Sequence, residues 1–144
     1  MKKLNLKEAA GEFEMINSET YVFYNAETGE FGHYMEGVDP EYDDRERFEG
    51  DDWIAGPDVY EINEYGMMVD FADGVTDPRA SELLSVALDG KGAFRRFRDV
   101  LHRVGLTKEW EVFRRNAYAD IVREWCNDNK IPYEDVSPDS GPNN

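Results

Sequence analysis

The distribution of apolar residues predicts strands in the first third of the chain. Residues 20–24 read T-Y-V-F-Y, which is β-branched and aromatic throughout and predicts a strand. The turn sequence N-A-E-T-G then leads to a second predicted strand at residues 30–35, so the pair predicts a β-hairpin. Residues 37–52 are polar and precede the short apolar pair Trp53 and Ile54, and we expect them to form an exposed loop.

Helical spacing replaces this pattern after Pro57, where apolar residues recur every three or four positions. Asp77 and Pro78 form a typical N-cap and first turn of a helix that Gly90 closes. A second helix is predicted between Gly92 and Gly105, and Thr107 is expected to cap a third. Four apolar faces are predicted in turn: Ile62, Tyr65, Val69 and Ala72, with Met68 alongside; Leu83, Leu84, Ala87 and Leu88; Phe94, Phe97, Leu101 and Val104; and Trp110, Phe113, Ala117, Ile121 and Trp125.

The order of these elements predicts an α+β fold, with an N-terminal β-hairpin and a helical C-terminal half. A chain of 144 residues with no visible repeat or Pro/Gly-rich linker predicts one domain, spanning residues 1–136, with a solvated tail at 137–144. A last extended contact is expected near Ile131 and Tyr133. The core of the helical half is predicted to contain Phe94, Phe97, Leu101, Trp110, Phe113, Ile121 and Trp125.

Cysteine usage and the first residues of the sequence favour a reducing compartment. Cys126 is the single cysteine, so no disulfide can form within the chain, and the start of the sequence lacks the apolar stretch of a signal peptide. No run approaches the roughly 18 apolar residues of a membrane span. We therefore expect a cytoplasmic protein that does not enter a membrane.

Charge is distributed unevenly along the chain, whose formal net charge is −16. Residues 1–90 contain 23 acidic and six basic residues, whereas residues 91–125 contain five acidic and nine basic ones. Such polarisation affects association and solubility rather than fold. It offers a partner two electrostatically different surfaces.

Several ordered motifs resemble a known family. These are G-K-G-A-F-R-R-F-R-D-V-L from Gly90, the pair Trp110 and Phe113, the E-W-C ending at Cys126, the hairpin sequence Y-V-F-Y-N-A-E-T-G-E, and I-N-E-Y-G-M-M-V-D-F. Together they resemble a widespread family of small, uncharacterised bacterial proteins over roughly residues 4–133. The resemblance implies a bacterial cytoplasmic α+β protein and supplies no activity or catalytic residue. The acidic loop at 36–52 departs from the family pattern.

The acidic loop is the first candidate site. It does not match a calcium-binding loop, because a loop begun at Asp39 has Asp44 where glycine is needed and Gly50 where glutamate is needed. One interpretation is a solvated run of charge. The other is a surface that mimics a phosphate backbone or occupies a basic groove on a protein partner, with Tyr42, Phe48 and Trp53 as aromatic anchors. The partner-binding residues predicted on this basis are Asp39, Glu41, Tyr42, Asp43, Asp44, Asp51, Asp52 and Trp53.

The arginine-rich helix that begins at Gly92 is the second candidate. A helix N-terminus favours anions, and guanidinium groups bind phosphate, so this segment could hold phosphate or nucleic acid. The anion-binding residues predicted on this basis are Lys91, Gly92, Arg95, Arg96 and Arg98. The alternative is internal neutralisation, in which Arg95 and Arg103 each pair with Asp99 along one helix face.

Signatures of catalysis and of metal binding are missing from the sequence. The two histidines, His33 and His102, lie in different predicted elements, and no H-x-x-x-H, C-x-x-C or G-x-S-x-G spacing occurs. Cys126 is expected to be a packed thiol. We therefore predict no cofactor, no metal and no catalytic residue, and the leading hypothesis is an acidic regulator or inhibitor of a protein with a basic surface. Direct nucleic-acid or phosphate binding and an uncharacterised enzyme are the alternatives.

Overall fold

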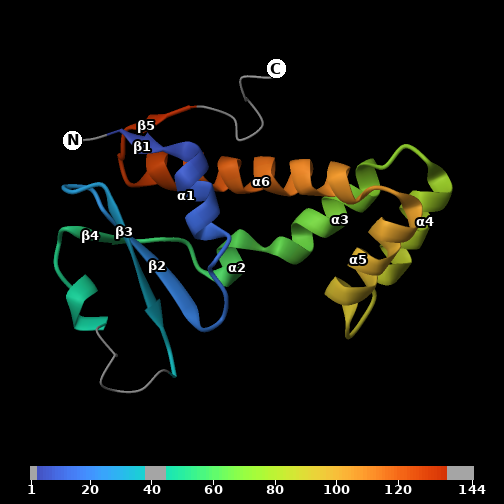
Figure 1. Ribbon diagram of the computed structural model, residues 1–144, viewed down its shortest axis with the longest axis horizontal. Coiled ribbons are helices and arrows are strands. Elements are labelled where there is room, and N and C mark those ends of the chain that lie inside the picture. Colours follow the sequence, from blue (N-terminus) through green and yellow to red (C-terminus); the bar gives the residue numbers. More distant parts are fainter. Residues whose placement is uncertain (1–2, 38–44, 136–144) are drawn as a thin grey trace. The chain divides into compact units, whose positions relative to one another are not determined.

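The computed structural model describes residues 3–37 and 45–135 and confirms the α+β class, with strands in the N-terminal part and helices in the C-terminal half (Figure 1). Two compact units can be distinguished within it. Met1–Ile62 and Tyr118–Asn144 form the sheet unit, and Asn63–Ala117 form the helical unit. The boundary falls inside α6 (Thr107–Asp128), which contributes residues to both units. The predicted tail at 137–144 lies outside the described residues.

The sheet unit is built on a three-stranded antiparallel sheet of order β3-β2-β4. The predicted hairpin is confirmed as β2 (Thr20–Asn25) and β3 (Glu30–Met35). The Asn25 side-chain oxygen accepts hydrogen bonds from the amides of Glu27 and Thr28, at 2.9 and 3.1 Å, and thereby shapes the turn. The third strand, β4 (Trp53–Ala55), was not predicted; Trp53 therefore lies in the sheet, directly after the polar segment.

Two helices and a pair of short parallel strands complete the sheet unit. They are α1 (Leu6–Phe13), which Asn5 caps by accepting from the Glu8 amide at 3.0 Å, and α2 (Val59–Ile62). β1 (Leu4–Asn5) pairs with β5 (Tyr133–Glu134), so the expected extended contact near the end of the chain is confirmed. Because the first and last described segments join here, residues far apart in sequence close this unit.

Trp125 of α6 forms the centre of the core behind the sheet. Its ring meets Phe13 edge to face at 5.2 Å and Tyr24 at 5.9 Å, and its indole N–H donates to the Ala55 carbonyl at 2.9 Å. Buried aromatic pairs of this geometry contribute beyond their area, and the hydrogen bond satisfies the one polar atom of the indole. α6 is therefore fixed to both α1 and the sheet.

The opposite face of the sheet is covered by the short 3-10 helix η2 (Arg45–Phe48). The Phe48 ring stacks on Phe23 at 4.4 Å with an interplanar angle of 3°, and it lies directly over Gly32, where a Cβ atom would come within 2.8 Å of the ring Cζ. Gly32 is therefore required by this close approach rather than by its backbone conformation. Phe48 is only 6% exposed, so its predicted role as a partner-binding anchor is wrong.

In the helical unit the structure corrects two predicted faces. The helix expected from Pro57 onward is interrupted at Asn63, which adopts a left-handed conformation with φ of 50° and caps α3 (Glu64–Gly74) by accepting from the Gly66 amide. α3 buries Met67, Met68, Phe71 and Ala72, whereas the predicted Tyr65 is 45% exposed and donates its hydroxyl to the Leu88 carbonyl.

The remaining helices confirm most of the predicted boundaries. α4 (Pro78–Ala87) begins after its Asp77 cap, and α5 (Ala93–Val104) ends at the left-handed Gly105. α6 begins at Thr107, but the Trp110 amide bonds to the Leu106 carbonyl, so Leu106 rather than Thr107 occupies the capping position.

An aromatic cluster forms the core of the helical unit. Phe71 lies at its centre, with ring centroids 6.4, 5.5 and 5.4 Å from Phe97, Trp110 and Phe113. Phe97 is fully buried, but Phe94 is 48% exposed, so its predicted place in the core is wrong. α5 instead buries Ala93, Phe97, Val100 and Leu101, a face rotated slightly from the predicted one.

Candidate functional site

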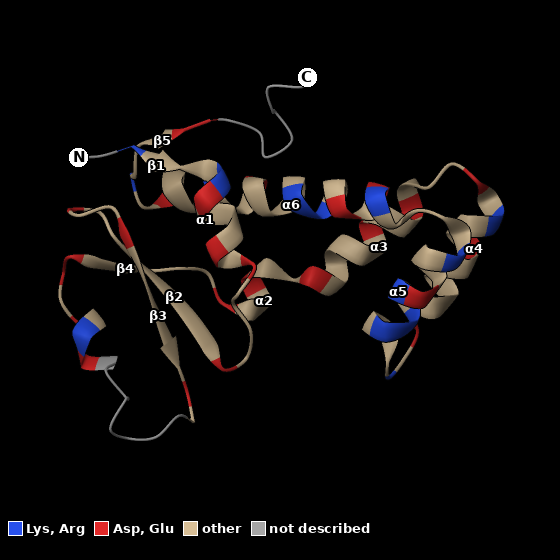
Figure 2. Cartoon of the chain, in the orientation of Figure 1, with Lys and Arg blue, Asp and Glu red and all other residues tan. Residues whose placement is uncertain are grey.

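The two units differ in net charge. The helical unit contains nine acidic and nine basic residues, so the entire net charge of −16 belongs to the segments assigned to the sheet unit. Figure 2 shows basic residues of the helical unit on both α5 and α6, whereas acidic residues recur along α1 and at the ends of the sheet strands. The sheet unit is therefore the anionic part of the molecule.

Three of the eight predicted partner-binding residues, Asp51, Asp52 and Trp53, lie in the part of the chain that the structure describes. The other five lie outside the described residues: Asp39, Glu41, Tyr42, Asp43 and Asp44.

Asp51 and Asp52 are exposed in the turn before β4, while Trp53 is half-buried. The Trp53 ring packs edge to face against Phe48 at 4.9 Å, and the Arg47 guanidinium lies 5.5 Å from the Trp53 ring centroid. Trp53 thus has structural contacts of its own, whereas the two aspartates face solvent.

A cleft in the sheet unit brings carboxylates from two distant segments together. It has a volume of about 290 Å³ and is lined by Pro57, Glu61, Ile121, Glu124, Trp125 and Asp128. We call it the acidic cleft. Three of its lining residues are apolar and three are acidic, and none of the basic residues in the described part of the chain lines it. Such a lining can hold the aliphatic stem of a long cationic side chain and its charged head.

The electrostatics of the acidic cleft are unfavourable in the free protein. Glu124 and Asp128 are exposed and stand four residues apart on α6, where like charges repel. They also occupy the last turns of a 22-residue helix, the end at which the backbone dipole favours cations. Neither carboxylate forms a side-chain hydrogen bond or ion pair with another described residue. Glu61 accepts one bond, from the Asp58 amide at 3.1 Å.

Of the predicted anion-binding residues at the start of α5, Arg96 has structural partners. Arg96 folds back on the preceding turn, where its guanidinium donates to the carbonyls of Ala87 at 3.0 Å, of Gly90 at 3.4 Å, and of Asp89 and Lys91. Arg96 therefore fixes the α4–α5 turn, and most of its donors are occupied. Lys91 and Arg95 are exposed, and Gly92 precedes the helix in a left-handed conformation without a side-chain cap.

The alternative interpretation, internal ion pairing along α5, is wrong for the two pairs that were predicted. Among the described residues, no ion pair joins Asp99 to Arg95 or to Arg103. Arg98 instead lines a cleft of about 330 Å³ together with Phe97, Trp110 and Glu111, and at its edge Arg114 pairs with Glu64 at 2.6 Å. This cleft mixes both signs of charge and favours neither anions nor cations.

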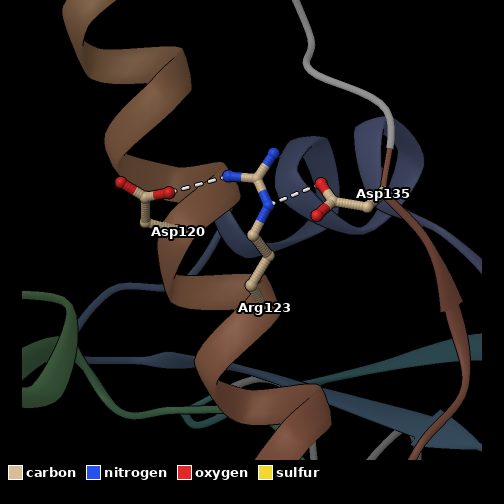
Figure 3. Close-up of polar contacts among 3 residues, drawn as sticks. All are labelled: Asp120, Arg123 and Asp135. Atoms are coloured by element: carbon tan, nitrogen blue, oxygen red, sulfur yellow. Dashed lines mark hydrogen bonds and ion pairs between the residues drawn. The ribbon is translucent and has the colours of Figure 1, made fainter.

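A further arginine of α6 has a structural role. Arg123 lies between Asp120 and Asp135, donating to each carboxylate at 2.7 Å (Figure 3). The hydrogen bond with Asp135 is the main reason that the pKa of Arg123 is raised. Because Asp135 directly follows β5, this pair ties the end of the described chain to the helix.

The single cysteine and the two histidines lie in different environments. Cys126 is fully buried, and burial raises the pKa of its thiol from 9.0 to about 12, so the thiolate is strongly disfavoured at neutral pH. His33 contacts Glu12 at 2.5 Å on the exposed side of α1, whereas His102 is exposed on α5. Within the described ranges, no group of three His, Cys, Asp or Glu residues is arranged to hold a metal ion. None of the helices in these ranges is both long and apolar enough to cross a membrane.

Comparisons with known proteins found no relative. A scan against protein-family models, a search of curated proteins and a search of solved structures each gave no match to this chain. The family resemblance therefore stays a hypothesis.

Proposed function

We propose that this protein is a non-enzymatic interaction module that binds a basic surface of another protein through its sheet unit. The observation that carries the proposal is the acidic cleft, which Glu61, Glu124 and Asp128 line together with three apolar residues, and which no basic residue of the described ranges lines. A Lys or Arg side chain of the partner would place its stem against Trp125 and its charged head among the carboxylates.

The charges of the acidic cleft favour binding of a cationic side chain. A cation inserted between Glu124 and Asp128 relieves their mutual repulsion and compensates the negative end of α6. Asp51 and Asp52 add two exposed negative charges elsewhere on the same unit, and the high net charge accelerates association with a basic partner. A protein that covers a basic groove in this way would regulate or inhibit whatever that groove normally binds, including nucleic acid.

The test separates a specific site from general charge. Binding of a short oligoarginine peptide to the full chain is measured by calorimetry for three double variants that each remove two negative charges. Glu124→Gln with Asp128→Asn changes the acidic cleft, Asp51→Asn with Asp52→Asn changes the turn before β4, and Glu27→Gln with Glu30→Gln changes the hairpin end as the control.

The cleft variant is expected to bind about five- to thirty-fold more weakly than wild type, because each partly exposed charge pair is worth about 0.5–1 kcal/mol. The hairpin variant is expected to change affinity by about two-fold at most, through the smaller net charge alone. Equal losses in the cleft and hairpin variants would contradict a specific site. Tight, salt-sensitive binding of single- or double-stranded nucleic acid by the wild type would favour the nucleic-acid alternative instead.

A further inference from the structure

A second cleft lies within the helical unit, at the C-terminal end of α3 and the first turns of α6. Its volume is about 320 Å³, at the small end of the range for pockets that hold small molecules. The residues that line it are Asp70, Phe71, Gly74, Val75, Thr76, Leu106, Glu109 and Phe113. A bounded cleft of this size suits a compact organic molecule.

The floor of this cleft is apolar and incompletely covered. The ring centroids of Phe71 and Phe113 are 5.4 Å apart, with an interplanar angle of 64°. Phe71 also packs against the rings of Phe97 and Trp110. Phe113, Val75 and Leu106 are each half-buried, so part of their apolar surface remains in water. A ligand with an apolar body would remove this surface from water, which is favourable.

The two charged residues given for the lining of this cleft, Asp70 and Glu109, are both acidic. Asp70 on α3 and Glu109 on α6 are exposed, and neither forms a side-chain hydrogen bond or ion pair with another described residue. Gly74 is the last residue of α3, so the negative end of that helix lies at the cleft as well. Within residues 3–37 and 45–135, no Lys, Arg or His lines it. Aromatic faces beside carboxylates are the groups that recognise an organic cation.

We propose that this cleft binds a small organic ammonium compound, with its apolar body against Phe71 and Phe113 and its protonated amine at the carboxylates of Asp70 and Glu109. This site belongs to the helical unit and is independent of the acidic cleft. It gives the protein a capacity to bind an amine that the protein-interaction role does not require.

Three ligands of similar shape and different charge test the proposal on the full chain: 2-phenylethylamine, 2-phenylethanol and 3-phenylpropanoate. In NMR titrations we expect the amine to bind about ten-fold more tightly than the alcohol, and the carboxylate to bind most weakly. Asp70→Asn with Glu109→Gln should reduce this preference to about two-fold or less while leaving the affinity for the alcohol unchanged. Glu82→Gln with Asp99→Asn removes the same charge outside the cleft and should leave the preference intact.

Several results would overturn the proposal. These are equal affinity of the wild type for amine and alcohol, no saturable binding of the amine, or loss of the preference in the control variant. A capped Leu-Lys-Leu peptide that competes with the amine and binds more than about ten-fold more tightly would show that the cleft receives a protein side chain instead. Because none of these variants alters Glu124 or Asp128, failure here is distinguishable from failure of the proposed function.

Discussion

Arg96 offers a quantitative test of how the structure reassigns the arginine-rich helix. Its guanidinium donates to four carbonyls at the α4–α5 turn, one of them in the part-buried bond to Ala87. Counting about 1 kcal/mol for the part-buried bond and about 0.5 kcal/mol for each of the others, Arg96→Met should lower the free energy of unfolding by roughly 2–3 kcal/mol. For a chain of this length this corresponds to a decrease in melting temperature of roughly 6–9 °C.

Differential scanning calorimetry of three variants checks the reasoning. Arg95→Met removes the same charge from the neighbouring exposed position and should change stability by about 0.5 kcal/mol at most. Arg96→Lys keeps the charge but loses the planar fork, so it should recover less than half of the loss. If Arg96→Met has the same melting temperature as the wild type but a lower affinity for inorganic phosphate, the guanidinium binds an anion and does not stabilise the turn. That result would refute the structural role of Arg96.

Three other predictions concern packing and ionisation. Phe97→Ala should cost roughly 3–5 kcal/mol of stability in urea unfolding, whereas Phe94→Ala should cost about 0.5 kcal/mol or less; equal effects would show that the buried face of α5 is misassigned. Gly32→Ala should cost roughly 1–3 kcal/mol, because its Cβ displaces the Phe48 ring, and an unchanged melting temperature would contradict this contact. Cys126 has a raised folded-state pKa, so the native state retains its proton where the unfolded state loses it; stability should therefore fall as pH rises from about 9 toward 12, and Cys126→Ala should show a smaller fall.

Local signals predicted much of the fold. The hairpin follows from the β-branched and aromatic residues of β2 and from the turn sequence between Asn25 and Gly29, and the start of α4 follows from Asp77 and Pro78. Spacing alone could not choose between overlapping faces of α5, because the predicted and the observed faces share Phe97 and Leu101 and differ by a small rotation. Strand β4 was missed because three residues are too few to display alternation.

The candidate sites were less predictable than the fold. The acidic cleft joins Glu61 of α2 to Glu124 and Asp128 of α6, and no pattern within one sequence shows that segments so far apart will meet. One signal was nevertheless present. Two acidic residues four positions apart near the C-terminal end of a long helix are electrostatically unfavourable, because they repel each other and because the helix dipole disfavours negative charge there. The role of Arg96 could not be predicted either, because an arginine that donates to backbone carbonyls and an arginine that binds phosphate can have the same neighbours in the sequence.

The most direct test of the interaction role is parallel affinity capture from a bacterial lysate with three immobilised proteins: wild type, Glu124→Gln with Asp128→Asn, and Glu27→Gln with Glu30→Gln. Mass spectrometry of the eluates at low and high salt identifies what each retains. We expect that wild type and the hairpin variant retain the same basic protein at low salt, that high salt releases it, and that the cleft variant retains several-fold less. Equal retention by all three proteins, or capture that persists at high salt, would contradict the claim that the acidic cleft binds a basic partner.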